Sequence, residues 1–250
     1  MVSRKVLSID GAITFVVVVV VLVPSVLLIP EKFEDTFMRK CLEVKEEKGN
    51  CEKAWVLFEK AYVGKDPDTV TPDKYNDLFD LIPFNHPCKK SLLWSKTSDL
   101  VMLVEKGKCY VPIAHNKLGY MLDGLKWCGK ENSKETITLD MKAKSIPYIS
   151  FWTTASIRYA QYACEEVKAL LNGDVTDPYS TNSFFGAYEV PNLEHPRVTK
   201  LDVILAVEKE GTQCNKESLK NLKNYVEQKK IGYDCNEVLR SQVEKILNTC

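Results

Sequence analysis

KLDVILAV, residues 200–207, is the stretch that most directly indicates the fold class. It is short and its last five residues are all apolar, a composition that predicts a β-strand. KSLLWS (90–95) has the character of a short buried strand, and residues 184–190, within SFFGAYEVPNL, look like a third strand. Because helical stretches separate these three runs, we expect a small, mostly parallel sheet with helices on its faces.

Helical patterns account for much of the remaining chain. Apolar side chains recur at three- and four-residue steps from about residue 150, and Asn172-Gly173 ends the run as a C-terminal cap would. On this predicted helix, Trp152 and Ser156 lie one turn apart on the same face. Further helices are expected over 41–60, after Thr71, and over 99–107, 118–128, 216–230 and 236–248.

The order of these elements predicts an α/β protein of two lobes that follow an N-terminal transmembrane helix. One lobe is mainly helical, and the other holds the small sheet flanked by helices. The predicted boundaries are a short cytosolic tail (1–10), a transmembrane signal-anchor (11–30), a helical lobe (31–87 and 112–163) and an α/β lobe (88–111 and 164–250).

The predicted membrane segment is an uncharged run of 20 residues between Asp10 and Glu31. A run of about 20 apolar residues can cross a bilayer. Arg4 and Lys5 precede it and acidic residues follow it, so we expect a type II orientation with an extracellular or lumenal domain. The alternative is a signal peptide whose cleavage would release a secreted protein. Either interpretation sends residues 31–250 into the secretory route.

Charge and cysteine usage narrow the function classes. The chain carries 34 basic and 34 acidic side chains, which argues against nucleic acid as a partner. Its nine cysteines form no C-x-x-C pair and its three histidines are scattered, so disulfides are favoured over a metal site. Spacing alone leaves the pairing open, and the odd total leaves at least one thiol over.

No single residue of the chain indicates a catalytic function when it is considered alone. A single glutamate in a strand, such as Glu189, usually lies on a solvated face, and Trp94 or Trp152 would more often be core than ligand platform. A serine within a helix, such as Ser156, is usually inert. However, Trp94-Ser95 ends one predicted strand and Glu189 lies near the end of another, where ligands of α/β sheets collect. A shared cleft is therefore one interpretation of these positions.

Five blocks in a fixed order carry a resemblance to a known family. They are LLWS (92–95), LGYMLDGLKWCG (118–129), SFWTTAS (150–156), ALLNG (169–173) and SFFGAYEVPNL (183–193). Over about residues 38–250 the chain resembles the ADP-ribosyl cyclase / NAD⁺ glycohydrolase family. The resemblance implies a two-lobed, membrane-anchored ecto-enzyme that cleaves the nicotinamide–ribose bond of NAD⁺ to give ADP-ribose and/or cyclic ADP-ribose. NAD⁺ would be the substrate, with no cofactor and no metal.

The same resemblance implies roles for individual residues. Glu189 matches the catalytic glutamate that stabilises the oxocarbenium-like centre. Trp94 and Trp152 match the tryptophans that flank the cleft, and Ser156 matches the serine placed at the ribose and phosphate. The implied substrate-binding positions are Ser95, Lys96, Phe184 and Phe185 at the diphosphate and Asp123 near the nicotinamide carboxamide.

Two departures from the family pattern stand out. Ala114, with His115 beside it, takes the place of a glutamate that helps to set the balance between cyclisation and hydrolysis. A catalytically weakened cell-surface receptor or adhesion module is therefore the alternative function, and the oligomeric state stays open, a homodimer included.

The cysteines also depart from the family. The resemblance implies the pairs Cys41–Cys51, Cys88–Cys164 and Cys214–Cys235. It also leaves Cys109 as a substitute partner for Cys128, and it places the partner of Cys250 beyond the end of the chain.

Overall fold

A parallel sheet of five strands lies within the computed structural model, which describes residues 33–44, 50–134 and 145–250. Its strands are β1 (Ser91–Ser95), β2 (Val111–Pro112), β3 (Glu165–Asn172), β4 (Val198–Val207) and β5 (Gly232–Leu239). They follow the order β2-β1-β3-β4-β5, and all neighbouring pairs are parallel. The predicted small parallel sheet is confirmed, as are the strands expected at 90–95 and 200–207.

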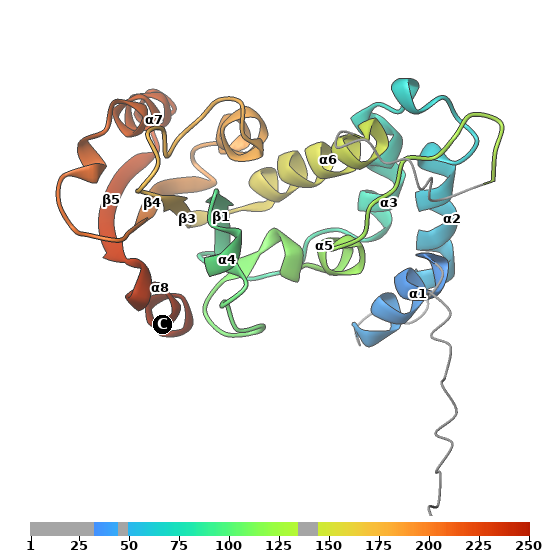
Figure 1. The fold of residues 1–250 in the computed structure, drawn as a ribbon, viewed down its shortest axis with the longest axis horizontal. Coiled ribbons are helices and arrows are strands. Elements are labelled where there is room, and N and C mark those ends of the chain that lie inside the picture. Colours follow the sequence, from blue (N-terminus) through green and yellow to red (C-terminus); the bar gives the residue numbers. More distant parts are fainter. Residues whose placement is uncertain (1–32, 45–49, 135–144) are drawn as a thin grey trace, which may run out of the picture. The chain divides into compact units, whose positions relative to one another are not determined.

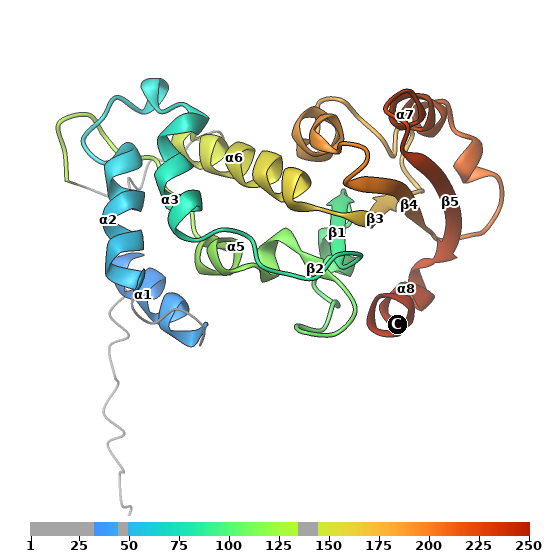
Figure 2. The same ribbon diagram turned by 180° about the vertical axis from the view of Figure 1, so that it is seen from behind.

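Helices occupy the rest of the described chain. They are α1 (Phe33–Glu43), α2 (Cys51–Tyr62), α3 (Asn76–Leu81), α4 (Ser98–Val101), α5 (Lys117–Leu122), α6 (Ile146–Tyr162), α7 (Glu217–Gln228) and α8 (Arg240–Asn248). Short 3₁₀ turns connect them: η2 (Pro67–Thr69), η3 (Pro72–Tyr75), η4 (Ile113–His115), η6 (Val190–Asn192) and η7 (Gln213–Asn215). A π-helix, η5, spans Phe185–Glu189. Helices α1, α2 and α3 gather at the far end from β5, and α6 runs between them and the sheet (Figures 1 and 2).

Both faces of the sheet are buried at β4, whose successive side chains point to opposite sides and enter two different hydrophobic clusters. On β4, Leu201, Val203 and Leu205 join the large hydrophobic core that also includes α7, whereas Ile204 and Ala206 join a smaller cluster with α4 and α8. Figure 1 shows α7 on one side of the sheet and α8 on the other. This double covering explains why KLDVILAV is a nearly continuous apolar run rather than an alternating one.

The helical part is held together by aromatic side chains that pack, mostly edge to face, around the fully buried Trp127. Its ring lies 5.1 Å from that of Phe58 and 5.5 Å from that of Phe151, centroid to centroid. The Trp127 Nε1 donates to the hydroxyl of Tyr75 at 3.0 Å, and this hydroxyl donates to the Pro147 carbonyl at 3.0 Å. The polar atoms of the cluster are thus satisfied, and they fix the start of α6.

Tyr159 fastens the other end of α6 to the sheet. Its buried hydroxyl accepts a hydrogen bond from the Leu92 backbone nitrogen at 3.0 Å and donates to the Val111 carbonyl. Leu92 lies on β1 and Val111 on β2, so one side chain joins the helix to two strands. Burial raises the pKa of the Tyr159 hydroxyl, which therefore stays neutral.

Several predicted elements are wrong. The helix predicted from about residue 150 to residue 172 ends at Tyr162, and residues 165–172 form the strand β3. The sequence did not separate the two, because the spacing of Ala163, Val167 and Leu170 fits a buried strand as well as a helix. Residues 232–239 form the edge strand β5 before α8, where the sequence predicted only a helix; residues 232–237 alternate between exposed and half-buried, and Val238 is buried. The segment at 184–190 is helical rather than a strand, and α4 is only four residues long.

Four disulfides join cysteines of the described residues. Cys41–Cys51, Cys88–Cys164 and Cys214–Cys235 form as the family resemblance implied. The expected substitute pair of Cys109 with Cys128 is wrong, since Cys109 bonds to Cys250 and Cys128 is free.

The physical reason for the Cys109–Cys250 bond lies at the end of α8. The side chain of Asn248 accepts from the Glu105 nitrogen at 2.8 Å and donates to the Leu103 carbonyl at 2.9 Å. These bonds hold the chain terminus beside the loop of Cys109, so Cys250 finds its partner within the chain.

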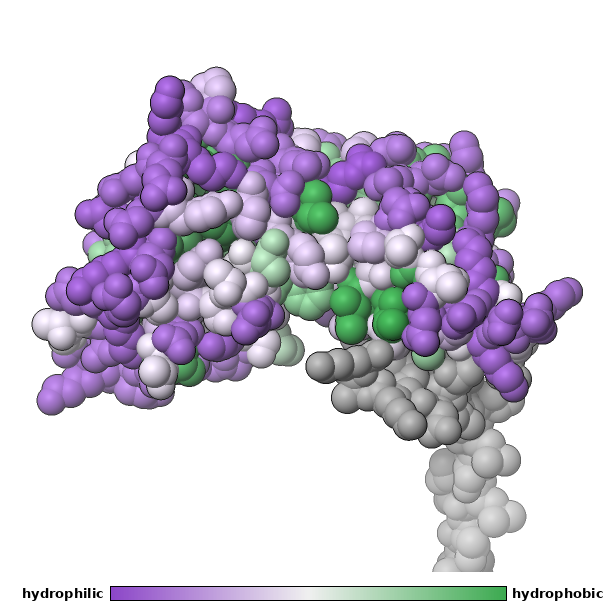
Figure 3. All heavy atoms as spheres, turned by 90° about the horizontal axis from the view of Figure 1, so that it is seen from above, coloured by the Kyte–Doolittle hydropathy of each residue, from purple (hydrophilic) through white to green (hydrophobic). Residues whose placement is uncertain are grey.

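The predicted membrane segment, 11–30, lies outside the described residues. Within the described ranges, no helix has the length and apolar character needed to span a bilayer. The face of the molecule seen in Figure 3 is largely hydrophilic, and its hydrophobic residues form small separate patches. The predicted lobe boundaries stay a prediction.

Candidate active site

A cavity of about 410 Å³ lies at the carboxyl end of β1, a volume in the range of small-molecule sites. All nine residues singled out in the sequence line it: Trp94, Ser95, Lys96, Asp123, Trp152, Ser156, Phe184, Phe185 and Glu189. The structure therefore brings together positions that are up to 95 residues apart. Five further residues share the lining: Ile113, Ala114, Tyr148, Asn182 and Ser183.

Glu189 ends the π-helix η5 and is only 6% exposed. Its Oε1 accepts a hydrogen bond from the Ser156 hydroxyl at 3.1 Å, whereas its Oε2 is buried and has no hydrogen-bond partner in the described chain. Burial raises the pKa of this carboxyl to about 8, and the Ser156 hydrogen bond offsets only part of that rise. An incompletely solvated carboxylate of this kind attracts positive charge strongly.

The helical turn at Glu189 follows from close backbone packing. A Cβ on residue 186 would lie 2.2 Å from the Ser180 carbonyl oxygen, so only glycine fits there. The Ser183 hydroxyl accepts from the Gly186 nitrogen at 3.1 Å, and the Ala187 nitrogen donates to the Ser183 carbonyl at 2.8 Å. Single-turn π-helices of this kind are frequent at functional sites.

A strand over 184–190 would have placed Phe185 and Glu189 on one face, and both do line the cavity. Residues four apart share a face in a strand and lie near each other on a helix, so the pairing survives the wrong secondary structure.

Helix α6 contributes Trp152 and Ser156, and their predicted common face is confirmed because both line the cavity. The ring of Trp152 lies 5.1 Å from that of Phe151 and 6.2 Å from that of Tyr148. The Trp152 Nε1 is buried and has no hydrogen-bond partner among the described residues. The indole thus forms an aromatic wall of the cavity beside Tyr148.

The end of β1 carries Trp94, Ser95 and Lys96. Lys96 has a φ of 58°, in the left-handed region that few non-glycine residues adopt, and its ammonium donates to the Asp177 carbonyl at 3.0 Å. Next to it, the Thr97 hydroxyl donates to the Leu170 carbonyl on β3 at 3.0 Å. These bonds turn the chain sharply after the strand and hold its end at the cavity.

The opposite side of the cavity comes from the segment around α5. Ala114 lies on the turn η4, and Asp123 follows α5 on the exposed rim. A Cβ on residue 119 would lie 2.1 Å from the Ile113 carbonyl oxygen, so Gly119 lets α5 pack directly on this turn. The position that the family resemblance assigns to a glutamate therefore presents only a methyl group to the cavity.

Tyr148 lines the cavity but was not predicted from the sequence, although its position carries a clear signal. It lies four residues before Trp152 on α6, so helical spacing alone places it on the same face. It is half-buried, and burial raises the pKa of its hydroxyl, a rise that interaction with the Trp152 side chain partly offsets. The described residues hold no cluster of histidine, cysteine or carboxylate side chains suited to a metal ion.

The fold and the cavity together define an α/β protein with an enzyme-like cleft, in which a buried carboxylate faces aromatic walls. The family model described as ADP-ribosyl cyclase matches residues 30–248 of the chain. ADP-ribosyl cyclase/cyclic ADP-ribose hydrolase 1 of Mus musculus is 31% identical over 248 residues, which cover 88% of this chain and 79% of the relative. The Aplysia kurodai enzyme is 33% identical over 200 residues, which cover 76% of this chain and 71% of the relative.

Solved structures agree in fold. Aplysia cyclase, complexed with the substrate NGD and the product cGDPR, superposes with a TM-score of 0.77 at 29% identity, covering 87% of this chain and 92% of that one. Porcine CD38, complexed with a covalent intermediate, superposes with a TM-score of 0.75 at 29% identity, covering 83% of this chain and 96% of that one. The chain belongs to the ADP-ribosyl cyclase family, and the resemblance stated from the sequence is confirmed.

Proposed function

We propose that this protein cleaves the bond between nicotinamide and ribose in NAD⁺, releasing nicotinamide together with ADP-ribose and/or cyclic ADP-ribose. The observation that carries the proposal is the buried Glu189 carboxyl in one cavity with Trp94, Trp152 and Ser156. The named activities of the relatives support it, since they are ADP-ribosyl cyclases and cyclic ADP-ribose hydrolases.

The chemistry requires little more than a placed negative charge. Nicotinamide in NAD⁺ is already a cationic leaving group, so no acid need protonate it. Positive charge develops instead on the ribosyl carbon as the bond breaks, and a carboxylate beneath that carbon stabilises the transition state more than the ground state. Glu189 is the group that this cavity offers, with Ser156 fixing one of its oxygens at 3.1 Å.

Glu189 must be ionised to act in this way, although burial favours its protonated form in the empty cavity. A bound pyridinium cation would reverse this preference, because a nearby opposite charge lowers the pKa of a carboxyl. We therefore propose that Glu189 loses its proton to solvent water as the cationic substrate binds. The Glu189 carboxylate then becomes negatively charged only when the cationic substrate is bound beside it.

The intermediate has two fates, and the aromatic walls would decide between them. Attack by water gives ADP-ribose, whereas attack by the adenine ring gives cyclic ADP-ribose. Phe184 is 39% exposed at the cavity rim, so it can contact a folded nucleotide. The porcine relative complexed with a covalent intermediate supports a route in which Glu189 itself bonds to the ribosyl carbon before either attack.

The other cavity residues would hold the substrate. Lys96 supplies a positive charge and Ser95 a hydroxyl at the proposed diphosphate position, while Phe184 and Phe185 cover that end. Asp123, on the exposed rim, would accept from the nicotinamide carboxamide. Stacking on Trp94 and Trp152 would exclude water from the reacting carbon.

We further propose that residues 11–30 anchor the protein in a membrane as a type II protein, with the catalytic domain extracellular or lumenal. The disulfides between described cysteines support an oxidising compartment.

Incubating the full-length chain with NAD⁺ and separating the products by chromatography tests the activity. Wild type should release nicotinamide, and Glu189→Gln should reduce the rate at least about a hundredfold, in the range seen when one electrostatic catalytic group is removed. The matched control is Glu194→Gln, since Glu194 is an exposed glutamate five residues further along.

Absence of release from a folded wild-type protein would favour the weakened receptor or adhesion module, which Ala114 in the cavity makes the alternative. Equal rates for Glu189→Gln and wild type would show that the carboxylate has no catalytic role.

A further inference from the structure

Tyr148 lines the catalytic cavity, yet the proposed reaction gives it no role. It lies in the first turn of α6, one turn before Trp152, and both side chains face the cavity. Its ring packs at 65° to the ring of Trp127 with centroids 5.1 Å apart, and at 63° to the ring of Trp152 with centroids 6.2 Å apart. Because Trp127 is fully buried, the tyrosine ring is held between the hydrophobic core and the cavity.

The backbone beside Tyr148 is also anchored. The Pro147 carbonyl accepts from the Tyr75 hydroxyl at 3.0 Å, and the Ser145 hydroxyl donates to the Trp127 carbonyl at 2.5 Å. A ring fixed in this way loses little conformational entropy when its hydroxyl binds a ligand.

The hydroxyl of this half-buried tyrosine keeps its proton and is able to donate it. Burial raises the pKa of the Tyr148 hydroxyl, the Trp152 side chain partly offsets this rise, and the charge of Asp123 adds a smaller rise. An indole carries a donor but no acceptor, so Trp152 cannot receive the proton. Among the described residues, the Tyr148 hydroxyl donates no hydrogen bond.

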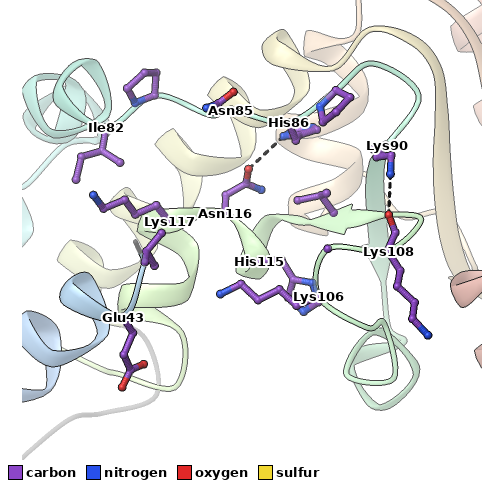
Figure 4. A pocket seen from close by; sticks show the side chains of 15 residues that line it. Glu43, Ile82, Asn85, His86, Lys90, Lys106, Lys108, His115, Asn116 and Lys117 are labelled. Carbon is purple, nitrogen blue, oxygen red and sulfur yellow. Dashed lines mark hydrogen bonds between the residues drawn. The ribbon is translucent and has the colours of Figure 1, made fainter. Parts of the chain in front are cut away.

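The turn η4 forms a neighbouring wall of the cavity and presents only apolar side chains there. Its Ile113 and Ala114 line the cavity, and the turn contacts α6. The turn is fixed, because the Asn116 amide nitrogen donates to the Pro112 carbonyl at 3.2 Å and the Asn116 Oδ1 lies 3.1 Å from the His86 Nδ1 (Figure 4). Asn116 and His86 line a separate cavity, so a polar contact for a ligand at this wall must come from a neighbouring element.

Two side chains near this wall have oxygen atoms that Glu189 does not engage. Among the described lining residues from α6 and the segment 113–123, these are Tyr148 and Asp123, since the Ser156 hydroxyl already bonds to Glu189 at 3.1 Å. A carboxylate only accepts hydrogen bonds, whereas the tyrosine hydroxyl has a proton to donate. A carboxamide matches this pair, because it offers an NH₂ group to the carboxylate and a carbonyl oxygen to the hydroxyl.

We propose that Tyr148 is a specificity-determining residue, whose hydroxyl donates to the carbonyl oxygen of the nicotinamide carboxamide while Asp123 accepts from its NH₂ group. This role rests on the proposed function, which brings nicotinamide into the cavity beside Trp152. Recognition of the leaving group then belongs to the start of α6 and the end of α5, rather than to Ala114 on η4. Loss of the hydroxyl should therefore weaken the binding of those dinucleotides that carry a strong acceptor at the carboxamide position.

Isothermal titration tests this role in the full-length chain with Glu189→Gln, which slows turnover of the bound substrate. Kd is compared with and without Tyr148→Phe for NAD⁺, its 3-acetylpyridine analogue and its thionicotinamide analogue. The first two keep the carbonyl oxygen, whereas the third carries sulfur, a weak acceptor. Because one neutral hydrogen bond is lost, Tyr148→Phe should raise Kd about fivefold for the first two and less than about twofold for the third.

Tyr225→Phe is the matched control, because Tyr225 is 39% exposed on α7 and lies outside the cavity. It should change each Kd less than about twofold. Far-ultraviolet circular dichroism confirms that each variant is folded.

Two patterns would overturn the role of Tyr148. One is an unchanged Kd for NAD⁺ in Tyr148→Phe, and the other is the same rise for all three dinucleotides, which loss of packing alone would give. If wild type releases nicotinamide from NAD⁺ in either case, the proposed function stands and only this role fails. If NAD⁺ is neither bound nor cleaved, both fail. The expected pattern of Kd values without release by wild type would support this role and refute the reaction.

Discussion

The pKa of Glu189 makes a quantitative prediction about folding stability. The carboxyl titrates at about 8 in the folded protein and near its ordinary value of 4.5 in the unfolded chain. Between these values the folded protein holds a proton that the unfolded chain has released, so the free energy of unfolding falls as pH rises from 4.5 to about 8. At about 1.4 kcal/mol per pH unit, the total loss is of the order of 5 kcal/mol.

Glu189→Gln removes this titration while preserving the shape of the side chain. The variant also leaves a buried amide NH₂ where Oε2 has no partner, a constant cost of about 1–3 kcal/mol. We therefore expect the variant to be the less stable protein near pH 5 and the more stable one above about pH 8. Between these values, the free energy of unfolding of the variant relative to wild type should rise by about 1.4 kcal/mol per pH unit. The pH dependence of the difference, rather than its offset, is the prediction.

Urea unfolding with the disulfides intact, followed by tryptophan fluorescence from about pH 5 to about pH 9, measures the difference. Glu194→Gln is the control, because its side chain is exposed and its difference from wild type should not change with pH in this way. A stability difference between Glu189→Gln and wild type that stays constant from pH 5 to 8 would refute the reasoning. So would the same trend in the control.

Three further predictions concern activity and covalent structure. We expect kcat/KM for NAD⁺ to rise with pH and to reach its half-maximum near pH 8, because kcat/KM reports the ionisation of Glu189 in the free enzyme. The half-maximum of kcat should lie at a lower pH, because the bound cationic substrate lowers the pKa of Glu189. Identical pH profiles for kcat and kcat/KM would contradict this expectation. Ala114→Glu adds a carboxylate to the cavity and should change the ratio of cyclic ADP-ribose to ADP-ribose by several-fold in product chromatography, and an unchanged ratio would show that the position has no such influence. Peptide mapping without reduction should recover Cys109 joined to Cys250, and Cys250→Ser should lower the free energy of unfolding by about 2–5 kcal/mol, whereas recovery of Cys109 joined to Cys128 would contradict the structure.

The fold class was predictable from the sequence because two strands are short apolar runs with both faces buried. β4 is recognisable from KLDVILAV, and β1 from KSLLWS. β3 was not, since its apolar spacing continues that of α6 and only tertiary pairing with β1 and β4 separates them. β5 lies at the edge, where half-exposed polar residues carry no strong strand signal.

The candidate site was predictable in membership but not in geometry. The family resemblance named nine of the fourteen described residues that line the cavity as site residues, yet nothing local in the sequence brings Glu189 to Ser156, 33 residues away. The π-helix was hidden because it depends on a close approach of the Gly186 backbone to Ser180, six residues earlier, which no hydrophobic periodicity reports. Tyr148, in contrast, was available from helical spacing alone.

The bonds of Tyr159 to β1 and β2 have a consequence for how the cavity can vary. Trp94 stands on β1, and Trp152 stands two turns before Tyr159 on α6, so the gap between the two indoles is set by a rigid helix clamped to the sheet. Substitutions in the flanking loops can change what enters the gap, but they leave its width unaltered. To admit a larger or smaller ring between the two indoles, the hydrogen bonds of Tyr159 to β1 and β2 would have to change.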